Sequence, residues 1–116
     1  MIFKGIAKTF SLEKEGQYDT IGAFWEEMAL LYGLENLQGL GYGWANNRIS
    51  YAIGLKDGDI PHYDTVISLP EDGWQQAMGE TDRLKQIYDR IYQDGPLAYE
   101  IEEFFENGTC VISYRR

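Results

Sequence analysis

The chain has 116 residues, which fits one domain around a single hydrophobic core and leaves no room for a second catalytic or DNA-binding domain. Its formal net charge of -9 repels nucleic-acid phosphates, so we expect no direct binding of DNA or RNA. The single cysteine excludes an intramolecular disulfide, and no signal peptide is recognisable, so we expect a cytoplasmic protein. No apolar run approaches the ~20 residues of a membrane span, so we expect no membrane contact.

In chain order, the first half of the sequence has the pattern of a strand, a helix and a hairpin. Residues 2–12 have the mixed apolar pattern of a strand, and residues 20–32 form a predicted helix that carries Phe24 and Trp25 on one apolar stripe. Residues 34–41 are predicted to be a flexible connector. Hairpin arms at residues 42–44 and 48–56 then flank Asn46 and Asn47, a pair that tolerates positive φ.

The second half repeats this order. Residues 63–78 are predicted to form a strand interrupted at 70–73, residues 82–92 a helix, and residues 97–105 and 110–114 hairpin arms around Asn107 and Gly108. Helix starts and hairpin turns recur at an offset of about 61 residues. The sequence therefore predicts one α+β domain over residues 1–116, with βαββ halves at 1–57 and 58–116. The halves would share an antiparallel sheet with two helices and a pocket between them.

A glutamate in the last predicted hairpin is the main candidate for chemistry. Side chains alternate along a strand, so Glu103 shares a face with Tyr99, Ile101 and Phe105. A carboxylate in such an apolar row is costly unless it is protonated, hydrogen-bonded or paired with a cation. Glu103 is therefore either a ligand-pairing or acid/base group, or a partly exposed or internally satisfied strand residue. At the offset of about 61 it corresponds to Tyr42, and we expect the chemistry at this difference between the halves.

Aromatic residues make up 15% of the chain and spread over both halves. Taken singly, each ring is more commonly a core residue, but rings with a few polar tips also build ligand pockets. His62 and Cys110 have no partners at metal-ligand spacing, and no cofactor motif is present, so no metal and no cofactor are predicted. The predicted ligand-binding residues are Phe24, Trp25, Tyr42, Trp44, Tyr51, Trp74, Tyr99, Glu103 and Phe105.

The repeated order of elements, with TIGAFWEEM on the first helix, RISYAIGL in a hairpin strand and DGP before EEFFENGTCVISY, resembles the GyrI-like small-molecule-binding domain. This module is also attached to many AraC-type and MerR-type regulators. The resemblance spans essentially the whole chain and implies a hydrophobic pocket with an acidic residue inside it. Glu103, Phe105 and Gly108 match the family's Glu-x-aromatic-x-x-Gly stretch. Many members carry a carboxylate in the last strand, which residues 110–114 lack; this difference argues against lipophilic cations and shifts the acidic role to Glu103.

Three alternative functions follow. The first is a standalone protein that binds a hydrophobic or aromatic small molecule, in drug or toxin sensing or sequestration. The second is a hydrolase that opens the cyclopropane of planar DNA-alkylating compounds, with Glu103 as acid/base and Tyr42 or Tyr114 assisting. The third is an acidic interaction protein that inhibits DNA gyrase. An exposed sheet edge would also allow a homodimer.

Overall fold

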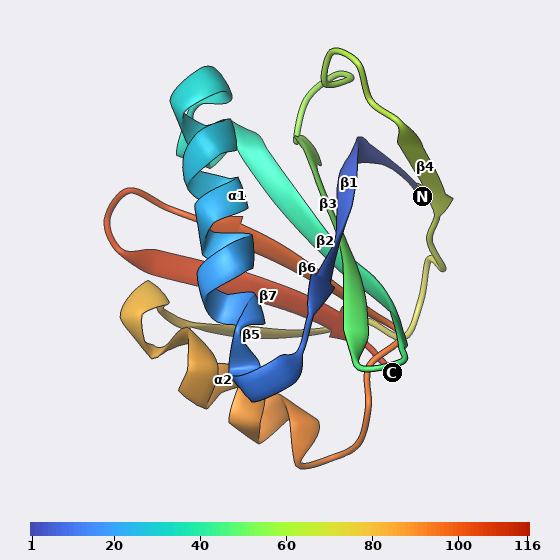
Figure 1. The fold of residues 1–116 in the computed structure, drawn as a ribbon, viewed down its shortest axis with the longest axis vertical. Helices are drawn as coiled ribbons and strands as arrows, with labels where there is room; N and C mark the ends of the chain where they lie inside the picture. The colour runs from blue at the N-terminus through green and yellow to red at the C-terminus, as the bar shows by residue number, and fades with distance from the viewer.

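The sheet at the centre of the fold contains seven antiparallel strands, and both helices pack on one of its faces (Figure 1). The computed structural model describes residues 1–116, and it confirms the predicted α+β class. Neither helix has the length and apolar character that a membrane crossing requires. The elements are β1 (Ile2–Ser11), α1 (Gln17–Tyr32), β2 (Leu37–Ala45), β3 (Arg48–Leu55), β4 (Thr65–Ser68), β5 (Gln75–Glu80), α2 (Leu84–Tyr92), β6 (Tyr99–Phe104) and β7 (Thr109–Arg115).

The two halves meet in the middle of the sheet, where β2 pairs with β6; we call this pairing the seam. The strand order is β4-β1-β3-β2-β6-β7-β5, which is symmetric about the seam once β4 is set aside. Gln38 pairs with Gly54 in the first hairpin, and Tyr99 pairs with Arg115 in the second. Both positions of the second pair lie 61 residues after those of the first, so the two hairpins have the same register. Leu40 and Ile101 have the same separation and pair with each other, so they lie on the pseudo-twofold axis.

Residues 34–41 are the largest correction to the predicted elements, because β2 begins at Leu37 and occupies the centre of the sheet instead of a flexible connector. Leu37 and Leu40 are fully buried. Gly39 and Gly41 gave this run the appearance of a loop, yet both are required by packing. A Cβ atom at position 39 would lie within 2.7 Å of the Tyr51 ring, and one at position 41 would lie 2.7 Å from the Glu100 carboxyl group.

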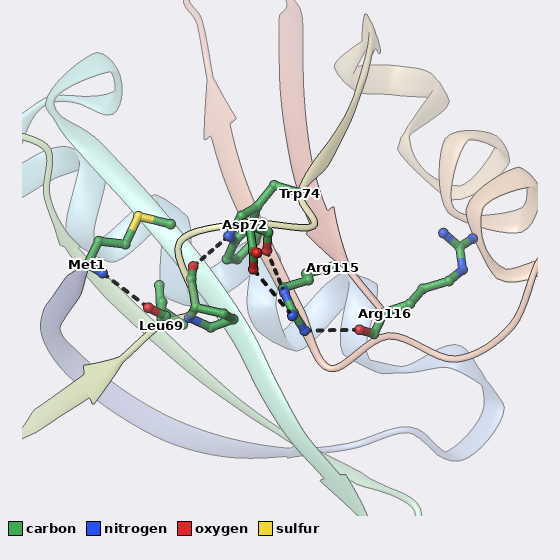
Figure 2. Close-up of polar contacts among 7 residues, drawn as sticks. Met1, Leu69, Asp72, Trp74, Arg115 and Arg116 are labelled. Atoms are coloured by element: carbon green, nitrogen blue, oxygen red, sulfur yellow. Dashed lines mark hydrogen bonds and ion pairs between the residues drawn. The ribbon is translucent and has the colours of Figure 1, made fainter.

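The interrupted strand predicted at 63–78 is in fact two strands at opposite edges of the sheet, β4 beside β1 and β5 beside β7. Figure 2 shows how the segment between them is held. The Met1 amine donates a hydrogen bond to the Leu69 carbonyl oxygen at 3.1 Å, and the Trp74 indole donates to the Pro70 carbonyl at 2.8 Å. Arg115 donates to the Asp72 carbonyl at 2.7 Å. These contacts fix Trp74 on the face of the sheet away from the helices.

Each face of the sheet has its own hydrophobic core. On the helix side, Phe24, Trp25 and Met28 of α1 and Tyr88 and Ile91 of α2 pack against buried residues of the sheet. The other face packs Leu40 and Ile101 of the seam against Phe3, Ala52 and Leu69. Because both faces are buried at the seam, apolar alternation in β6 does not reveal which side faces the helices.

The helices and turns agree with the sequence patterns within a few residues. Helix α1 begins at Gln17, three residues before the predicted start, and α2 begins at Leu84 after a 3₁₀ turn at Thr81–Arg83. Asn46 and Asn47 both have positive φ, at 52° and 58°, as the predicted hairpin turn requires. The turn at Asn107 and Gly108 is also present.

Candidate functional site

A cavity of about 400 Å³ lies on the helix side of the seam, between α1, α2 and the sheet. Its volume is within the range of roughly 300–1,000 Å³ found for small-molecule sites. Most of its walls are aromatic or aliphatic, and its charged side chains are two glutamates of β6. The lining includes Tyr18, Ile21, Gly22, Trp25, Trp44, Ile49, Tyr51, Leu84, Tyr88, Tyr92, Glu100, Glu102, Phe104 and Phe105.

Glu102 is buried at the bottom of this cavity and held by hydrogen bonds to both carboxylate oxygens. The Tyr51 hydroxyl donates to Oε1, and the Tyr88 hydroxyl donates to Oε2 at 2.7 Å. The Trp25 indole donates to the Tyr51 oxygen at 2.8 Å, so a chain of donors from α1, β3 and α2 converges on this carboxylate. Only 4% of Glu102 is exposed, and its position is fixed from both halves of the fold.

Glu100 lies two residues earlier on β6, on the same face, and is held less firmly. It is 5% exposed, and the Tyr92 hydroxyl donates one hydrogen bond to its Oε2 at 3.3 Å. No lysine or arginine forms an ion pair with either glutamate. Burial raises the pKa of Glu100 well above its usual value, and the charge of Glu102 raises it further. Burial also raises the pKa of Glu102, while its two phenol donors oppose that rise.

The tyrosines around the pair remain protonated donors. Burial, followed by the charge of Glu102, raises the pKa of Tyr51 well above its usual value. Burial and the charges of the two glutamates do the same for Tyr88. The pKa of Tyr18 rises to about 12, mainly through burial, and burial also raises the pKa of Tyr92. Deprotonating these phenols would place further negative charge beside buried carboxyl groups, so Tyr51, Tyr88 and Tyr92 act as hydrogen-bond donors to the pair.

Two glycines of β2 make room for this arrangement. Gly39 pairs with Glu102 across the seam, and Gly41 pairs with Glu100. At the separation of 61 positions, Gly39 corresponds to Glu100 and Gly41 to Glu102. Beside the cavity, the halves therefore differ at two glycines opposite two glutamates, whereas Tyr42 and Glu103, also 61 positions apart, lie outside the cavity lining.

Four predicted ligand-binding residues line the cavity: Trp25, Trp44, Tyr51 and Phe105. Phe24 packs in the neighbouring helix-side core. Trp44 reaches the cavity through a β-bulge, because the β2–β3 register shifts between Tyr42 and Ala45 and Gly43 has a φ of 64°. The extra residue places Trp44 on the helix side while Tyr42 stays on the opposite face.

The other predicted residues lie outside the cavity lining. Tyr42, Trp74 and Tyr99 pack against the core on the opposite face. The Trp74 and Tyr99 ring centroids are 6.3 Å apart. Tyr114 packs beside the helix-side core, under the Arg116 guanidinium group.

Glu103, the predicted acidic residue of the site, lies away from the cavity. Its carboxylate lies 3.0 Å from Lys56 Nζ and outside the cavity lining. The predicted alternation along β6 is present, but the apolar row containing Ile101 faces the second core, away from the helices. The sequence spacing could have indicated the residues that were not predicted. Glu100, Glu102 and Phe104 alternate along β6 and so share one strand face. Tyr88 and Tyr92 are four residues apart and so share one helix face.

Glu103→Gln tests whether Glu103 takes part in ligand binding. The Lys56 pair is partly exposed, so we expect its loss to lower the free energy of unfolding by no more than about 1 kcal/mol. Ligand affinity should stay within about twofold of wild type, because the carboxylate does not reach the cavity. Urea denaturation and a ligand titration measure the two quantities. A strong loss of affinity in this variant would restore Glu103 as the binding carboxylate.

No protein-family model matches this chain, and no curated protein matches it. Among solved structures, that of SAV2435 bound to tetraphenylphosphonium is similar, with a TM-score of 0.69 over 98% of this chain and 87% of that one. The sequences are 16% identical, so the similarity shows a shared fold alone. The GyrI-like family thus stays a prediction, supported at the level of the fold.

Proposed function

We propose that this protein binds a hydrophobic, aromatic small molecule in the cavity between its two halves, as a sensor or a sequestering protein. One observation carries the proposal: an aromatic cavity of about 400 Å³ surrounds two buried glutamates that have no cationic partner. A cavity that served only as imperfect core packing would not be expected to keep two carboxyl groups in its wall, because burying them is costly.

The arrangement of the walls indicates the kind of ligand. Trp25 and Phe104 meet edge to face with ring centroids 4.8 Å apart, and Trp44 and Phe105 add further apolar surface. Flat rings of a ligand would pack against these side chains. The carboxyl groups at the bottom of the cavity favour a positive charge on the ligand, and the aromatic walls favour it further through cation–π contacts.

The comparison with SAV2435 supports the same ligand class. That protein is bound to tetraphenylphosphonium, a cation enclosed by four phenyl rings. The absence of a carboxylate in residues 110–114 argued against such ligands for this chain. Glu100 and Glu102 weaken that argument, because β6 brings two carboxyl groups to the cavity from the neighbouring strand.

Titration with tetraphenylphosphonium and with a neutral planar polycycle tests the proposal. Trp25 and Trp44 line the cavity, so binding should change tryptophan fluorescence saturably with one ligand per chain. Absence of saturation with both compounds up to about 1 mM would contradict the proposal. Incubation with a planar, cyclopropane-containing alkylator followed by mass spectrometry separates binding from hydrolysis, since a hydrolase adds one water to that compound and a binding protein returns it intact. Glu100 and Glu102 are the carboxyl groups that line the cavity for such a reaction.

Gly22 offers a way to block the cavity without disturbing the fold. It lies on α1 in the cavity lining, and a Cβ atom there would meet nothing within 4 Å. Gly22→Leu should fill cavity volume and weaken ligand binding by about tenfold or more, while the better helix propensity raises the free energy of unfolding by up to about 1 kcal/mol. Gly22→Ala is the matched control and should gain stability but keep binding. Unchanged affinity in the leucine variant would place the ligand elsewhere.

A further inference from the structure

The two glutamates at the bottom of the cavity have unequal environments. Both oxygens of Glu102 accept hydrogen bonds from tyrosine hydroxyls, which favours its ionised form. Glu100 accepts one long hydrogen bond at Oε2 from Tyr92, and its Oε1 lies over the bare backbone of Gly41. Burial and the charge of Glu102 raise the pKa of Glu100 more than the Tyr88 hydroxyl, which donates to Glu102, lowers it. Glu100 is therefore the carboxyl group of the pair that is least prepared to carry a negative charge.

No other group nearby supplies a compensating positive charge. Strand β2 presents only Gly39 and Gly41 to the pair, and Arg116 is held instead by the Ile91 carbonyl oxygen and the Tyr114 ring. Two carboxylates in one buried site without a cation repel each other, so such a pair is expected to retain a proton. The titratable groups that face it are Tyr18 from α1, Tyr51 from β3, Tyr88 and Tyr92 from α2, and Cys110 and Tyr114 from β7.

We propose that the cavity exchanges one proton for a lipophilic monocation: Glu100 is protonated in the empty cavity and releases its proton to solvent when the cation binds beside it. This inference rests on the proposed function and adds the charge of its ligand. Before binding, the pair carries one negative charge, on Glu102. After binding, two carboxylates and one monocation again sum to one negative charge, so the buried site keeps the same net charge.

The exchange makes cation affinity depend on pH. While Glu100 is protonated in the empty cavity, affinity for a monocation should rise by about tenfold per pH unit, because one proton leaves for each cation bound. A neutral ligand of similar shape leaves the proton in place, so its affinity should not change over the same range. Cationic ligands are thus favoured at higher pH, and neutral ligands gain relative to them at lower pH.

Calorimetric titration of the whole chain with tetraphenylphosphonium, in buffers of different ionisation enthalpy, counts the protons released. We expect a count approaching one at pH values above the ordinary range of glutamate, where the empty cavity still holds its proton, and a count near zero with neutral triphenylphosphine oxide. In Glu100→Gln the proton count should fall to zero, and the weakened affinity for the cation should no longer change with pH. Glu103→Gln, the same substitution on the same strand but outside the cavity, should behave as wild type.

A second measurement needs no ligand. Infrared spectroscopy of the empty protein near neutral pH should show the carbonyl stretch of a protonated carboxyl group, and Glu100→Gln should remove it. Absence of this band in the wild-type protein would overturn the inference.

The outcomes also separate this inference from the proposed function. Binding of tetraphenylphosphonium with no proton release and no change over pH would overturn the exchange and leave the function intact. Binding of only the neutral compound would do the same. Failure of both compounds to bind would contradict the exchange and the proposed function together.

Discussion

Replacing Gly39 by alanine is expected to lower the free energy of unfolding by roughly 2 to 4 kcal/mol. The added Cβ would lie 2.7 Å from the Tyr51 ring and 2.8 Å from Trp25. Tyr51 is fully buried and cannot move aside without leaving Glu102. The substitution therefore combines overpacking at the seam with the loss of a hydrogen bond to a buried carboxylate.

The midpoint of urea denaturation measures this effect, and Gly22→Ala serves as the control. Both variants add one methyl group at a glycine on the helix side of the fold, but the space at Gly22 is open. Gly39→Ala should also weaken ligand binding, because Trp25 and Tyr51 would shift. A Gly39→Ala protein within about 0.5 kcal/mol of wild type would show that the seam is less tightly packed than described.

The second large effect concerns pH and Glu100. Its pKa in the folded protein lies well above the value of 4.5 for an unperturbed glutamate, chiefly through burial. The folded state then holds a proton that the unfolded chain releases, so stability from this group is present at low pH. It is lost as pH rises from about 4.5 through the raised folded-state pKa.

Glu100→Gln should remove this dependence. At about pH 8 the variant should be more stable than wild type by roughly 1 to 3 kcal/mol, and the difference should shrink toward about pH 5. Urea denaturation of both proteins across this range measures it. The Glu103→Gln protein, whose substitution lies outside the cavity, should instead run parallel to wild type. Parallel curves for Glu100→Gln would mean that Glu100 titrates as an ordinary carboxyl group.

The duplicated architecture could be predicted because local signals agreed with it. The turns at Asn46 and Asn47 and at Asn107 and Gly108 fix the hairpins, and the 61-residue offset recurs in the strand register. The central strand β2 could not be recognised, since Gly39 and Gly41 lack the side chains by which a buried strand is identified. Their requirement becomes visible only when Tyr51, Trp25 and Glu100 are in place above them.

The candidate site was partly predictable for a related reason. Rings on the helix and hairpins pointed to Trp25, Trp44 and Tyr51, yet the pattern in β6 has two equivalent interpretations when both faces of a strand are buried. The sequence favours Glu103 as the buried carboxylate, because its row on β6 is the more apolar one and apolar neighbours usually indicate the core. In the structure, the row that contains Ile101 and Glu103 faces the second core. Glu100 and Glu102, on the other face of β6, face the helices and line the cavity.

The pairing of glycine with glutamate across the seam makes the contributions of the two halves to the cavity unlike. Gly41 leaves the space that the Glu100 side chain fills, so a carboxyl group on β2 at this level would collide with the one on β6. Position 41 therefore has no room for an acidic side chain while the second half keeps Glu100. Both carboxyl groups of the cavity therefore come from β6 in the second half, and a ligand with one charged end should bind in a single orientation even though the fold around it is nearly symmetric.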